Sequence, residues 1–361
     1  MAYKNIDYKK TKELITKIFN AYGFTSEDSD IITDILLAAD LHGIESHGIQ
    51  RLIRYHKAIS EGVVNVHAEP EKLIETPISA VFDAHGAMGQ VISYAAMKLA
   101  IEKAKTTGIG MVTVRNSNHY GIAGYYSKMA SDEDLIGVCM TNTEAIMVPT
   151  FASKAMLGTN PIAVAMPADP TPFLFDAATT VVTRGKVEVY NKKEQPLPMG
   201  WTLDEKGLDC DDPGKVLYNI IHRVGGGILP LGGSGELHSG YKGYGFAMLC
   251  EIFTAILSCG TTSNHKTDRS DTSHCFWAID YGIFGDKKEI RSNMSRFLDE
   301  LRNAPKAEGA DRIYIHGEKE LESVADKTKN GIPVNEKTFG EIQDIAASLG
   351  ISSAEYIGAK F

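Results

Sequence analysis

The stretch Ile109-Gly110-Met111-Val112-Thr113-Val114-Arg115-Asn116-Ser117-Asn118-His119-Tyr120-Gly121 decides how this chain is interpreted. Its first six residues are mainly apolar and predict a buried strand. Small and aromatic residues follow Gly121 and predict the beginning of a helix. Such a turn opens on the crevice where α/β proteins carry out their chemistry. His119 lies in this turn, where it can exchange a proton near neutral pH or simply brace the chain.

Short apolar runs and helical patterns alternate on both sides of this turn. The predicted strands are residues 79–83, 109–114, 135–140, 162–166, 173–175, 276–279 and 312–315. The predicted helices of this part are residues 91–105, 244–258, 290–302 and 336–349. The first sixty residues predict helices only, and the third of these covers residues 46–60.

These elements predict an α/β fold with two domains. Residues 73–321 are expected to form an α/β domain on a mixed sheet, and residues 1–72 and 322–361 a separate helical domain. Neither G-x-G-x-x-G nor G-x-x-x-x-G-K-[ST] occurs in the sequence. The Rossmann fingerprint and the P-loop are therefore both missing. Either the protein binds no nucleotide, or it binds one on an unrelated fold.

The composition favours a folded protein that binds small molecules. The chain has 361 residues, of which 43% are hydrophobic, so it can bury a large core. Its formal net charge of -9 and its dispersed lysines and arginines argue against a nucleic acid or a membrane as partner. Its five cysteines form no C-x-x-C pair, which favours reduced thiols and a cytoplasmic location. The sequence predicts neither an export signal nor a membrane span.

A second group of polar residues precedes the strands. His47, Arg51 and Tyr55 recur every fourth residue and would form one stripe along a helix. The guanidinium of Arg51 can bind a carboxylate in two-pronged fashion, and Ser46 offers a further hydrogen bond. A solvated helix face is the alternative interpretation. Together with His119, the stripe suits a 2-hydroxy or 2-keto acid.

Two other kinds of chemistry find little support. The chain has eleven histidines, but it lacks H-E-x-x-H, and no tight carboxylate cluster accompanies His42 and His47. We therefore expect no required metal. No G-x-S-x-G occurs, which argues against a serine hydrolase.

Ordered motifs between about residue 40 and residue 335 resemble those of a known family. They include Leu41-His42-Gly43-x-x-Ser46-His47-Gly48, Asn116-Ser117-x-His119-Tyr120-Gly121, Leu157-Gly158-Thr159-Asn160-Pro161, Asp176-x-Ala178-Thr179-Thr180 and Tyr241-Lys242-Gly243-Tyr244-Gly245. On these residues the chain resembles the type II malate/L-lactate dehydrogenase family, which also contains ureidoglycolate, sulfolactate and 2,3-diketogulonate oxidoreductases.

The resemblance implies NAD(P)-dependent oxidoreduction on a non-Rossmann fold, in a homodimer. It implies His119 as the general acid/base, with His47 as a rival, and Ser46, Arg51 and Tyr55 as substrate-binding residues. The cofactor-binding residues that it implies are Thr143, Asp176, Ala178, Thr179, Thr180, Lys186, Lys242, His274, Gly317 and Glu318. His316 and Cys275 depart from the family pattern and leave the choice between NAD and NADP open.

Three functions follow from this sequence. The first is reversible oxidation of a small 2-hydroxy acid, of malate or L-lactate type, to its 2-keto acid. The second is reduction of a cyclic imino acid, or of another 2-oxo acid such as sulfopyruvate. The third is a non-catalytic binding protein on the same fold, which the presence of both histidines and Arg51 argues against.

Overall fold

The centre of the molecule is a seven-stranded mixed sheet. The computed structural model describes residues 2–267 and 270–359. In the sheet the strands follow the order β2-β3-β4-β10-β5-β6-β7. Only β3 and β4 are parallel, and every other neighbouring pair is antiparallel. A Rossmann sheet is mostly parallel, so the prediction of an α/β fold with a mixed, non-Rossmann sheet is confirmed.

Two small sheets accompany the central one. The strands of the described residues are β1 (Tyr3–Ile6), β2 (Glu71–Glu75), β3 (Ser79–Asp83), β4 (Ile109–Ser117), β5 (Ile136–Thr141), β6 (Ile162–Met166), β7 (Phe173–Ala177), β8 (Thr202–Leu203), β9 (Gly227–Ile228), β10 (Thr272–Ile279) and β11 (Ile332–Asn335). Strand β1 pairs with β11, and β8 pairs with β9.

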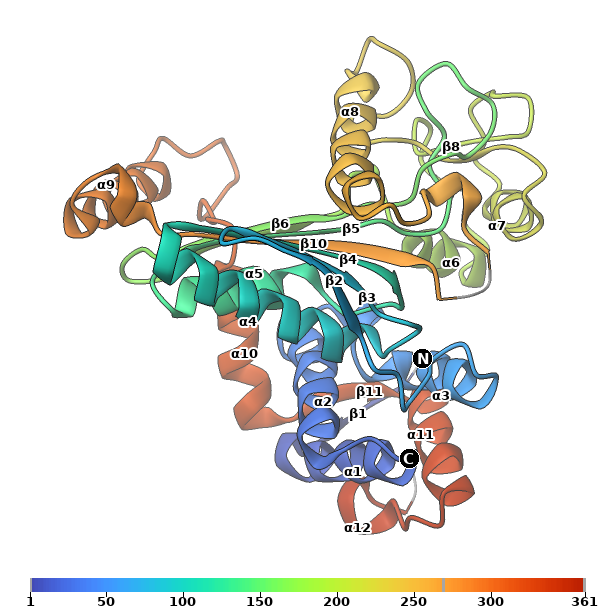
Figure 1. Cartoon of the computed structure of the whole chain (residues 1–361). Helices are drawn as coiled ribbons and strands as arrows, with labels where there is room; N and C mark the ends of the chain where they lie inside the picture. Colours follow the sequence, from blue (N-terminus) through green and yellow to red (C-terminus); the bar gives the residue numbers. More distant parts are fainter. Residues whose placement is uncertain (1, 268–269, 360–361) are drawn as a thin grey trace.

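The α-helices form layers around this sheet, as Figure 1 shows. They are α1 (Tyr8–Ala21), α2 (Ser26–Leu41), α3 (Leu52–Ser60), α4 (Gly89–Thr107), α5 (Ala123–Asp132), α6 (Arg184–Lys192), α7 (Pro213–His222), α8 (Gly240–Glu251), α9 (Lys287–Arg302), α10 (Glu318–Asn330), α11 (Glu336–Ser348) and α12 (Ala354–Ile357). Helices α4 and α5 cover one face of the sheet, and α8 lies over the opposite face at one end.

Helices α4 and α5 lie close to the sheet because glycines occupy the contact points. A Cβ atom on Gly110 of β4 would lie 2.0 Å from the carbonyl oxygen of Ala100 in α4. A Cβ atom on Gly137 of β5 would lie 2.1 Å from the carbonyl oxygen of Ser127 in α5. At each point where the backbone of a helix approaches, the strand therefore has a glycine, which has no side chain. This packing sets the position of β4 against α4 near the beginning of the strand, and the turn with His119 leaves the other end of the same strand.

The two ends of the chain form a helical body below the sheet (Figure 1). Ile15 and Phe19 of α1 belong to the same hydrophobic core as Phe339 and Ile342 of α11. Strand β1 also pairs with β11 along four residues. The division at residues 72/73 and 321/322 stays a prediction.

The chain between β7 and β10, with the loop between β5 and β6, forms a lobe beside the sheet that contains α6, α7, α8, β8 and β9 (Figure 1). It contains an apolar cluster of its own, in which Ile146, Val187, Val216 and Ile228 are buried. These residues were predicted to be part of the α/β domain, and no separate lobe was predicted.

Several predicted elements are wrong in detail. Residues 312–315 form no strand, and Ile315 packs into a small cluster with Leu298 instead. The helix predicted at 244–258 begins at Gly240 and passes into a π-helical turn, η3 (Ile252–Ile256). The first sixty residues also contain strand β1, which finds its partner only near the other end of the chain. Pairing over such a distance leaves no local signal in the sequence.

The close approach of α4 to β4 predicts a specific instability. Gly110→Ala should lower the free energy of unfolding by about 1–3 kcal/mol, because the new methyl group overlaps the Ala100 carbonyl. Gly340→Ala is the control, since Gly340 lies within α11 with no atom in the way of a Cβ, and this change should stabilise by up to about 1 kcal/mol. Urea unfolding of both variants measures the two effects. Equal stability of the two variants would contradict the packing argument.

Candidate active site

The turn that carries His119 is held rigidly between α4 and β4. Strand β4 ends at Ser117 and α5 begins at Ala123, so His119 lies in a strand-to-helix turn as predicted. A Cβ atom on Gly89 would lie 2.3 Å from the carbonyl oxygen of Asn118 and 2.4 Å from that of His119. The side-chain amide of Asn118 donates to the carbonyls of residues 86 and 87. The N-terminus of α4 therefore fixes the backbone of this turn.

The imidazole of His119 contacts two of the predicted substrate-site residues. Its Nδ1 lies 2.7 Å from the hydroxyl oxygen of Tyr55. Its ring stacks on the ring of His47, with centroids 5.5 Å apart. Among the described residues, Nε2 of His119 has no hydrogen-bond partner. Nδ1 is thus occupied, and Nε2 is the nitrogen available to a substrate.

The segment that carries His47, Arg51 and Tyr55 is not the single helix that the sequence predicts. It consists of two 3-10 turns, η1 (Glu45–His47) and η2 (Ile49–Arg51), and only then of helix α3. The reason is Gly48, where a Cβ atom would lie 2.0 Å from a carboxylate oxygen of Asp40. The same carboxylate accepts the Ile49 amide at 2.7 Å. Asp40 thereby breaks the helix and holds both turns.

Despite this break, the predicted substrate-site residues stay together. The hydroxyl of Ser46 lies 2.9 Å from Nδ1 of His47. The Nε of Arg51 donates to the carbonyl of Ser46, which leaves the two terminal nitrogens of its guanidinium for a ligand. His47, Ser46, Arg51 and Tyr55 therefore form one group beside His119. Their roles in binding remain a prediction.

Burial and positive charge keep both histidines neutral. Burial, followed by the charges of Arg51 and Arg54, lowers the pKa of His47 to about 4. Burial likewise lowers the pKa of His119 well below 6.5, and Arg54 is the largest charge contribution. Tyr55 is completely buried and its pKa is raised to about 12, so its hydroxyl stays protonated. The group accordingly presents neutral imidazoles next to permanently charged guanidinium groups.

The lobe supplies the other side of this group through the beginning of α6. A Cβ atom on Gly185 would lie 4.0 Å from the Cβ atom of Ser46. Arg184, which precedes Gly185 in the chain, forms an ion pair with Glu188 at 3.1 Å. The charges of both residues affect the pKa of Arg51. Helix α6, which was not predicted from the sequence, thus borders the candidate active site.

Asp176 connects this group to the predicted cofactor residues. Its carboxylate accepts the amide of Gly124 at 2.7 Å, at the N-terminus of α5. Solvent reaches the carboxylate, yet protein atoms surround it on most sides, and this desolvation raises its pKa to about 6. Further along, the Leu231 amide donates to the carbonyl of Thr179, and Gly243 of α8 packs against Leu231. The 176–180 segment therefore lies between the His119 turn and the start of α8.

Several of the predicted cofactor residues have groups free for a ligand. The hydroxyl of Thr180 is buried without a hydrogen-bond partner. Lys186 and Lys242 are exposed, and neither forms an ion pair with a described residue. Ala178, half-buried between Asp176 and Thr179, adds no polar side chain. Two free ammonium groups and an unpaired hydroxyl fit the phosphates and hydroxyls of a nicotinamide cofactor.

Other predicted cofactor residues are placed less favourably. His274 is fully buried, and its two nitrogens contact the hydroxyls of Thr141 and Ser117 at 2.8 and 3.0 Å. Glu318 is buried in ion pairs with Arg302 and Arg312, and a Cβ atom on the preceding Gly317 would lie 2.8 Å from Leu174. In this arrangement the side chains of His274 and Glu318 stabilise the fold and have no free group for a cofactor.

Two of the predicted threonines also have bonded hydroxyls. That of Thr143 accepts the amide of Thr159 at 2.9 Å. That of Thr179 donates to the carbonyl of Thr159 at 2.9 Å. Both hydroxyls tie the 143, 159 and 179 segments together, so Thr143 and Thr179 shape the loops of this region.

Three residues of this group were not predicted from the sequence. Asp40 holds the two 3-10 turns, and burial raises its pKa to about 8. Gln90 is completely buried, its side-chain amide lacks a well-oriented hydrogen bond, and it lies close enough to Tyr55 to affect the pKa of that phenol. Arg54 contributes its charge. The role of Asp40 could not be predicted from a regular helical pattern, because that pattern does not include the turn at Gly48. The role of Gln90 could not be predicted either, because its neighbours come from tertiary packing.

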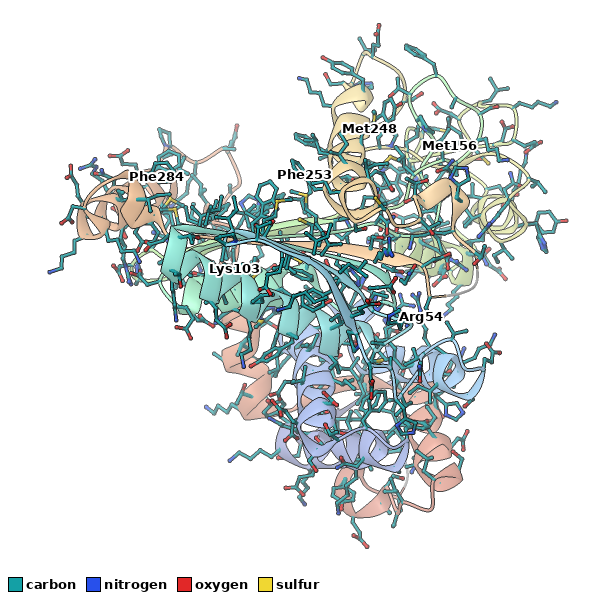
Figure 2. The ribbon with its side chains drawn as sticks, in the orientation of Figure 1. Arg54, Lys103, Met156, Met248, Phe253 and Phe284 are labelled. Carbon is teal, nitrogen blue, oxygen red and sulfur yellow. The ribbon has the colours of Figure 1, made fainter. Side chains whose placement is uncertain are left out.

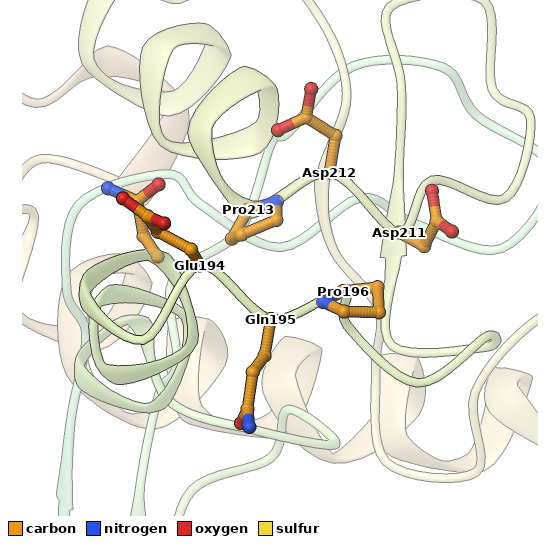
Figure 3. A pocket seen from close by; sticks show the side chains of 7 residues that line it. Glu194, Gln195, Pro196, Asp211, Asp212 and Pro213 are labelled. Atoms are coloured by element: carbon orange, nitrogen blue, oxygen red, sulfur yellow. The ribbon is translucent and has the colours of Figure 1, made fainter.

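Two surface hollows lie elsewhere. Figure 3 shows one of them, which contains none of the predicted site residues; it is lined by Asn191, Glu194, Gln195, Pro196, Asp211, Asp212 and Pro213. The other lies over α1, with Lys9, Lys12 and Glu13 among its lining residues. Neither contains a histidine or an unpaired buried polar group, whereas the contacts of His119 connect predicted site residues.

Two further features concern metals and membranes. Within residues 2–267 and 270–359, no three histidine, cysteine or acidic side chains gather so that they could hold a metal ion. The expected lack of a required metal stays a prediction. In the same ranges every helix falls short of the length and apolar character needed to cross a bilayer.

The burial of His274 predicts a pH-dependent contribution to stability. Its pKa is lowered to about 3, below the value of 6.5 that it has when unfolded, so its stabilising contribution is complete above pH 6.5 and is lost as the pH falls toward 3. Between pH 7 and pH 5, His274→Asn should therefore lose about 2 kcal/mol less stability than the parent protein does. Urea unfolding at both pH values measures this difference. Parallel losses in the two proteins would contradict the buried, neutral state of His274.

Comparisons with known proteins agree with this architecture. A family model described as malate/L-lactate dehydrogenase matches residues 6–343. A malate dehydrogenase of Pyrococcus abyssi is 43% identical over 98% of this chain and 97% of its own length. An L-sulfolactate dehydrogenase of Methanocaldococcus jannaschii is 36% identical over 96% of this chain and 97% of its own.

Solved structures give the same result. The crystal structure of a malate dehydrogenase from Entamoeba histolytica matches with a TM-score of 0.93 and 35% identity, covering 97% of this chain and 99% of that one. The relatives are named dehydrogenases or reductases, which supports an oxidoreductase. The family predicted from the motifs is confirmed: the chain belongs to the malate/L-lactate dehydrogenase family.

Proposed function

We propose that this protein is an NAD(P)-dependent dehydrogenase that interconverts a small 2-hydroxy acid and its 2-keto acid. One observation carries the proposal: Nδ1 of His119 is bonded to Tyr55 while Nε2 is open, next to a guanidinium with free donors. An open imidazole nitrogen can move the proton of a hydroxyl group. The neighbouring Arg51 can bind the carboxylate that such a substrate carries.

In the oxidative direction His119 acts as a base. Its lowered pKa keeps the imidazole neutral in the free protein. In the tautomer that carries the ring proton on Nδ1, where it can be donated to the Tyr55 hydroxyl, Nε2 can accept the proton of the C2 hydroxyl. Arg51 holds the carboxylate so that the hydroxyl faces this nitrogen. The nicotinamide cofactor supplies the hydride chemistry at C2. The Tyr55 hydroxyl contacts Nδ1 and stabilises the imidazolium that forms when His119 takes up the proton.

In the reductive direction His119 must first carry a proton. Burial and the arginine charges disfavour that protonated form in the free protein. An anionic substrate offsets these charges when it binds, and so favours the protonated imidazole at the moment when the proton is needed. His47 stays the rival proton carrier, since its ring lies against His119 and its pKa is also low.

For the cofactor we propose the surface formed by the 176–180 segment, the start of α6 and the start of α8. Lys186 and Lys242 would hold phosphate groups there, and the unpaired hydroxyl of Thr180 would complete a hydrogen bond. Either NAD or NADP is compatible with these residues. All five cysteines are free thiols, which supports the cytoplasmic location that we propose.

The assignment of His119 predicts a large loss of activity on substitution. His119→Ala should lower kcat by about 10²–10⁴-fold while the protein still binds its cofactor. Steady-state assays with oxaloacetate, pyruvate and sulfopyruvate, using NADH and NADPH, measure turnover, and cofactor fluorescence measures binding. His222→Ala, at the exposed end of α7, is the control. Near-normal turnover in His119→Ala, with a large loss in His47→Ala, would transfer the role to His47.

We also propose a homodimer that covers the outer side of α8 and the π-turn η3. Phe246, Leu249, Ile252 and Ile256 are between 41% and 55% exposed on that side. Figure 2 shows Met248 and Phe253 on the same elements, above the sheet. A contiguous apolar surface of this kind is typical of a subunit interface.

Ile252→Asp should therefore convert the dimer into a monomer. A carboxylate buried in an apolar interface has no partner, and its desolvation opposes association. Sedimentation velocity measures the mass, and Ile221→Asp on the exposed side of α7 is the control. A parent protein that sediments as a monomer, or a variant that stays dimeric, would contradict this interface.

A further inference from the structure

Gln90 is a buried polar residue that the proposed mechanism does not use. It is the second residue of α4, and its side chain is completely inaccessible to solvent. Neither the oxygen nor the nitrogen of its amide has a well-oriented hydrogen bond to any described residue. Such an amide costs free energy, because it loses its bonds to water and gains none in return. A methionine would fill a similar space without this cost, so the amide needs an explanation.

The backbone of α4 fixes Gln90 next to the His119 turn. The preceding residue is Gly89, where a Cβ atom would lie 2.4 Å from the carbonyl oxygen of His119. Met88, one residue earlier, is buried in the same apolar core as Tyr55. The side chain of Gln90 is also close enough to the Tyr55 hydroxyl to act on its pKa, although burial has the larger effect. Gln90 therefore lies near both partners of the hydrogen bond between Tyr55 and His119.

The hydrogen bond between Tyr55 and His119 can run in two directions. The hydroxyl oxygen of Tyr55 and Nδ1 of His119 are 2.7 Å apart, and one proton lies between them. When Tyr55 donates, the neutral imidazole has its proton on Nε2, which then cannot accept another. When His119 donates, Nε2 is free to accept the proton of a substrate hydroxyl. Only the second direction suits the oxidation that we propose.

The direction of this bond depends on where the Tyr55 hydroxyl places its own proton. If His119 donates to the phenol oxygen, the phenol proton needs another acceptor, and Tyr55 is buried away from water. Nδ1 is the one hydrogen-bond partner of this hydroxyl in the part of the chain that the structure describes. The amide oxygen of Gln90 can accept the proton.

The amide of Gln90 can turn either end toward Tyr55, because no other group holds it. A half-turn about its last bond exchanges oxygen and nitrogen and leaves the rest of the side chain in place. With the nitrogen toward Tyr55, Gln90 donates to the phenol oxygen, and the phenol proton is left for Nδ1. With the oxygen toward Tyr55, Gln90 accepts the phenol proton, and Nδ1 can donate. The two orientations thus correspond to the two tautomers of His119.

We propose that Gln90 is a positioning residue that accepts the proton of the Tyr55 hydroxyl and thereby keeps the ring proton of His119 on Nδ1. This inference rests on the proposed function, because it explains how Nε2 is kept open for the substrate. Gln90 acts through Tyr55 and not on the substrate itself. The proton of the substrate goes to Nε2, and the resulting imidazolium still donates from Nδ1 to Tyr55. Neither hydrogen bond therefore has to reverse during the reaction.

Gln90→Met tests this role, because it removes the amide and keeps the length of the side chain. Tyr55 then has Nδ1 as its remaining acceptor, so the ring proton of His119 should move to Nε2. The kcat for oxidation of malate or L-lactate should fall about 10- to 100-fold, since the reactive tautomer loses the bond that favours it. The KM of the substrate and the Kd of the cofactor should change much less. Gln90→Glu should retain most of the activity, because a carboxyl oxygen can also accept the Tyr55 proton.

The position of the ring proton is measured directly by long-range proton–nitrogen NMR spectra of protein with isotope-labelled histidine. Protonated and unprotonated ring nitrogens differ strongly in chemical shift, and the signals of His119 are assigned by their loss in His119→Gln. The parent protein and Gln90→Glu should have the proton on Nδ1, and Gln90→Met should have it on Nε2. This measurement requires no turnover, and a purely structural role of Gln90 would not move the proton.

A double-mutant cycle shows whether Gln90 acts through Tyr55. In the Tyr55→Phe background, Gln90→Met should have no further effect on kcat, because the hydroxyl that connects the two side chains is gone. Ser93→Ala is the matched control, since Ser93 lies one turn further along α4 and also has a buried, unpaired side-chain oxygen. It should leave both kcat and the ring proton unchanged. Thermal unfolding verifies that each variant is folded, and Gln90→Leu replaces a Gln90→Met protein that is not.

Three results would overturn the inference. They are a ring proton on Nε2 in the parent protein, a ring proton that stays on Nδ1 in Gln90→Met, and an undiminished effect of Gln90→Met in the Tyr55→Phe background. A parent protein that oxidises no 2-hydroxy acid with either cofactor would instead overturn the proposed function. The NMR spectra would then still show whether Gln90 directs the proton of His119, so the two failures can be distinguished.

Discussion

The hydrogen bond between the Tyr55 hydroxyl and Nδ1 of His119 connects two parts of the molecule that have separate cores. Tyr55 is buried in the core of the helical body, while the His119 turn is fixed by α4 and β4. The contact therefore determines how the two 3-10 turns before α3 face the sheet. Without it, Arg51 and His47 would still be ordered by Asp40, but their position relative to the imidazole would no longer be fixed.

The electrostatics around His47 and His119 follow from an excess of positive charge. Guanidinium groups gather around two half-buried imidazoles, and the described carboxylates close to them are either used in pairs or hold the backbone. This excess of positive charge disfavours protonation, so both imidazoles are neutral. An anionic ligand removes the imbalance. Ligand binding and proton uptake at His119 are therefore coupled, because a bound anion would offset the positive charge that opposes protonation of the imidazole.

Much of the sheet and the position of His119 could be predicted, because β4 is a local apolar run that ends in a turn. The stripe of His47, Arg51 and Tyr55 was predicted for the wrong reason, since a regular helix cannot pass the Asp40 carboxylate at Gly48. That contact depends on tertiary packing and leaves no local pattern. The sequence likewise does not show that His274 is buried with both ring nitrogens bonded, because its two hydroxyl partners come from different strands.

The structure of the candidate cofactor surface explains why the sequence lacks the glycine fingerprint. In a Rossmann unit, backbone amides at a helix N-terminus bind the pyrophosphate, and glycines allow the close approach. Here Asp176 already occupies the amide of Gly124 at the beginning of α5, so that position is closed to a phosphate. In the proposed function, positive charge would come from side chains instead. Lys186 and Lys242 are exposed, have no ion pair with a described residue, and are the cations that we propose for this surface. Because lysine side chains are long and flexible, such a surface needs no fixed glycine spacing, and a search for one in this sequence finds nothing.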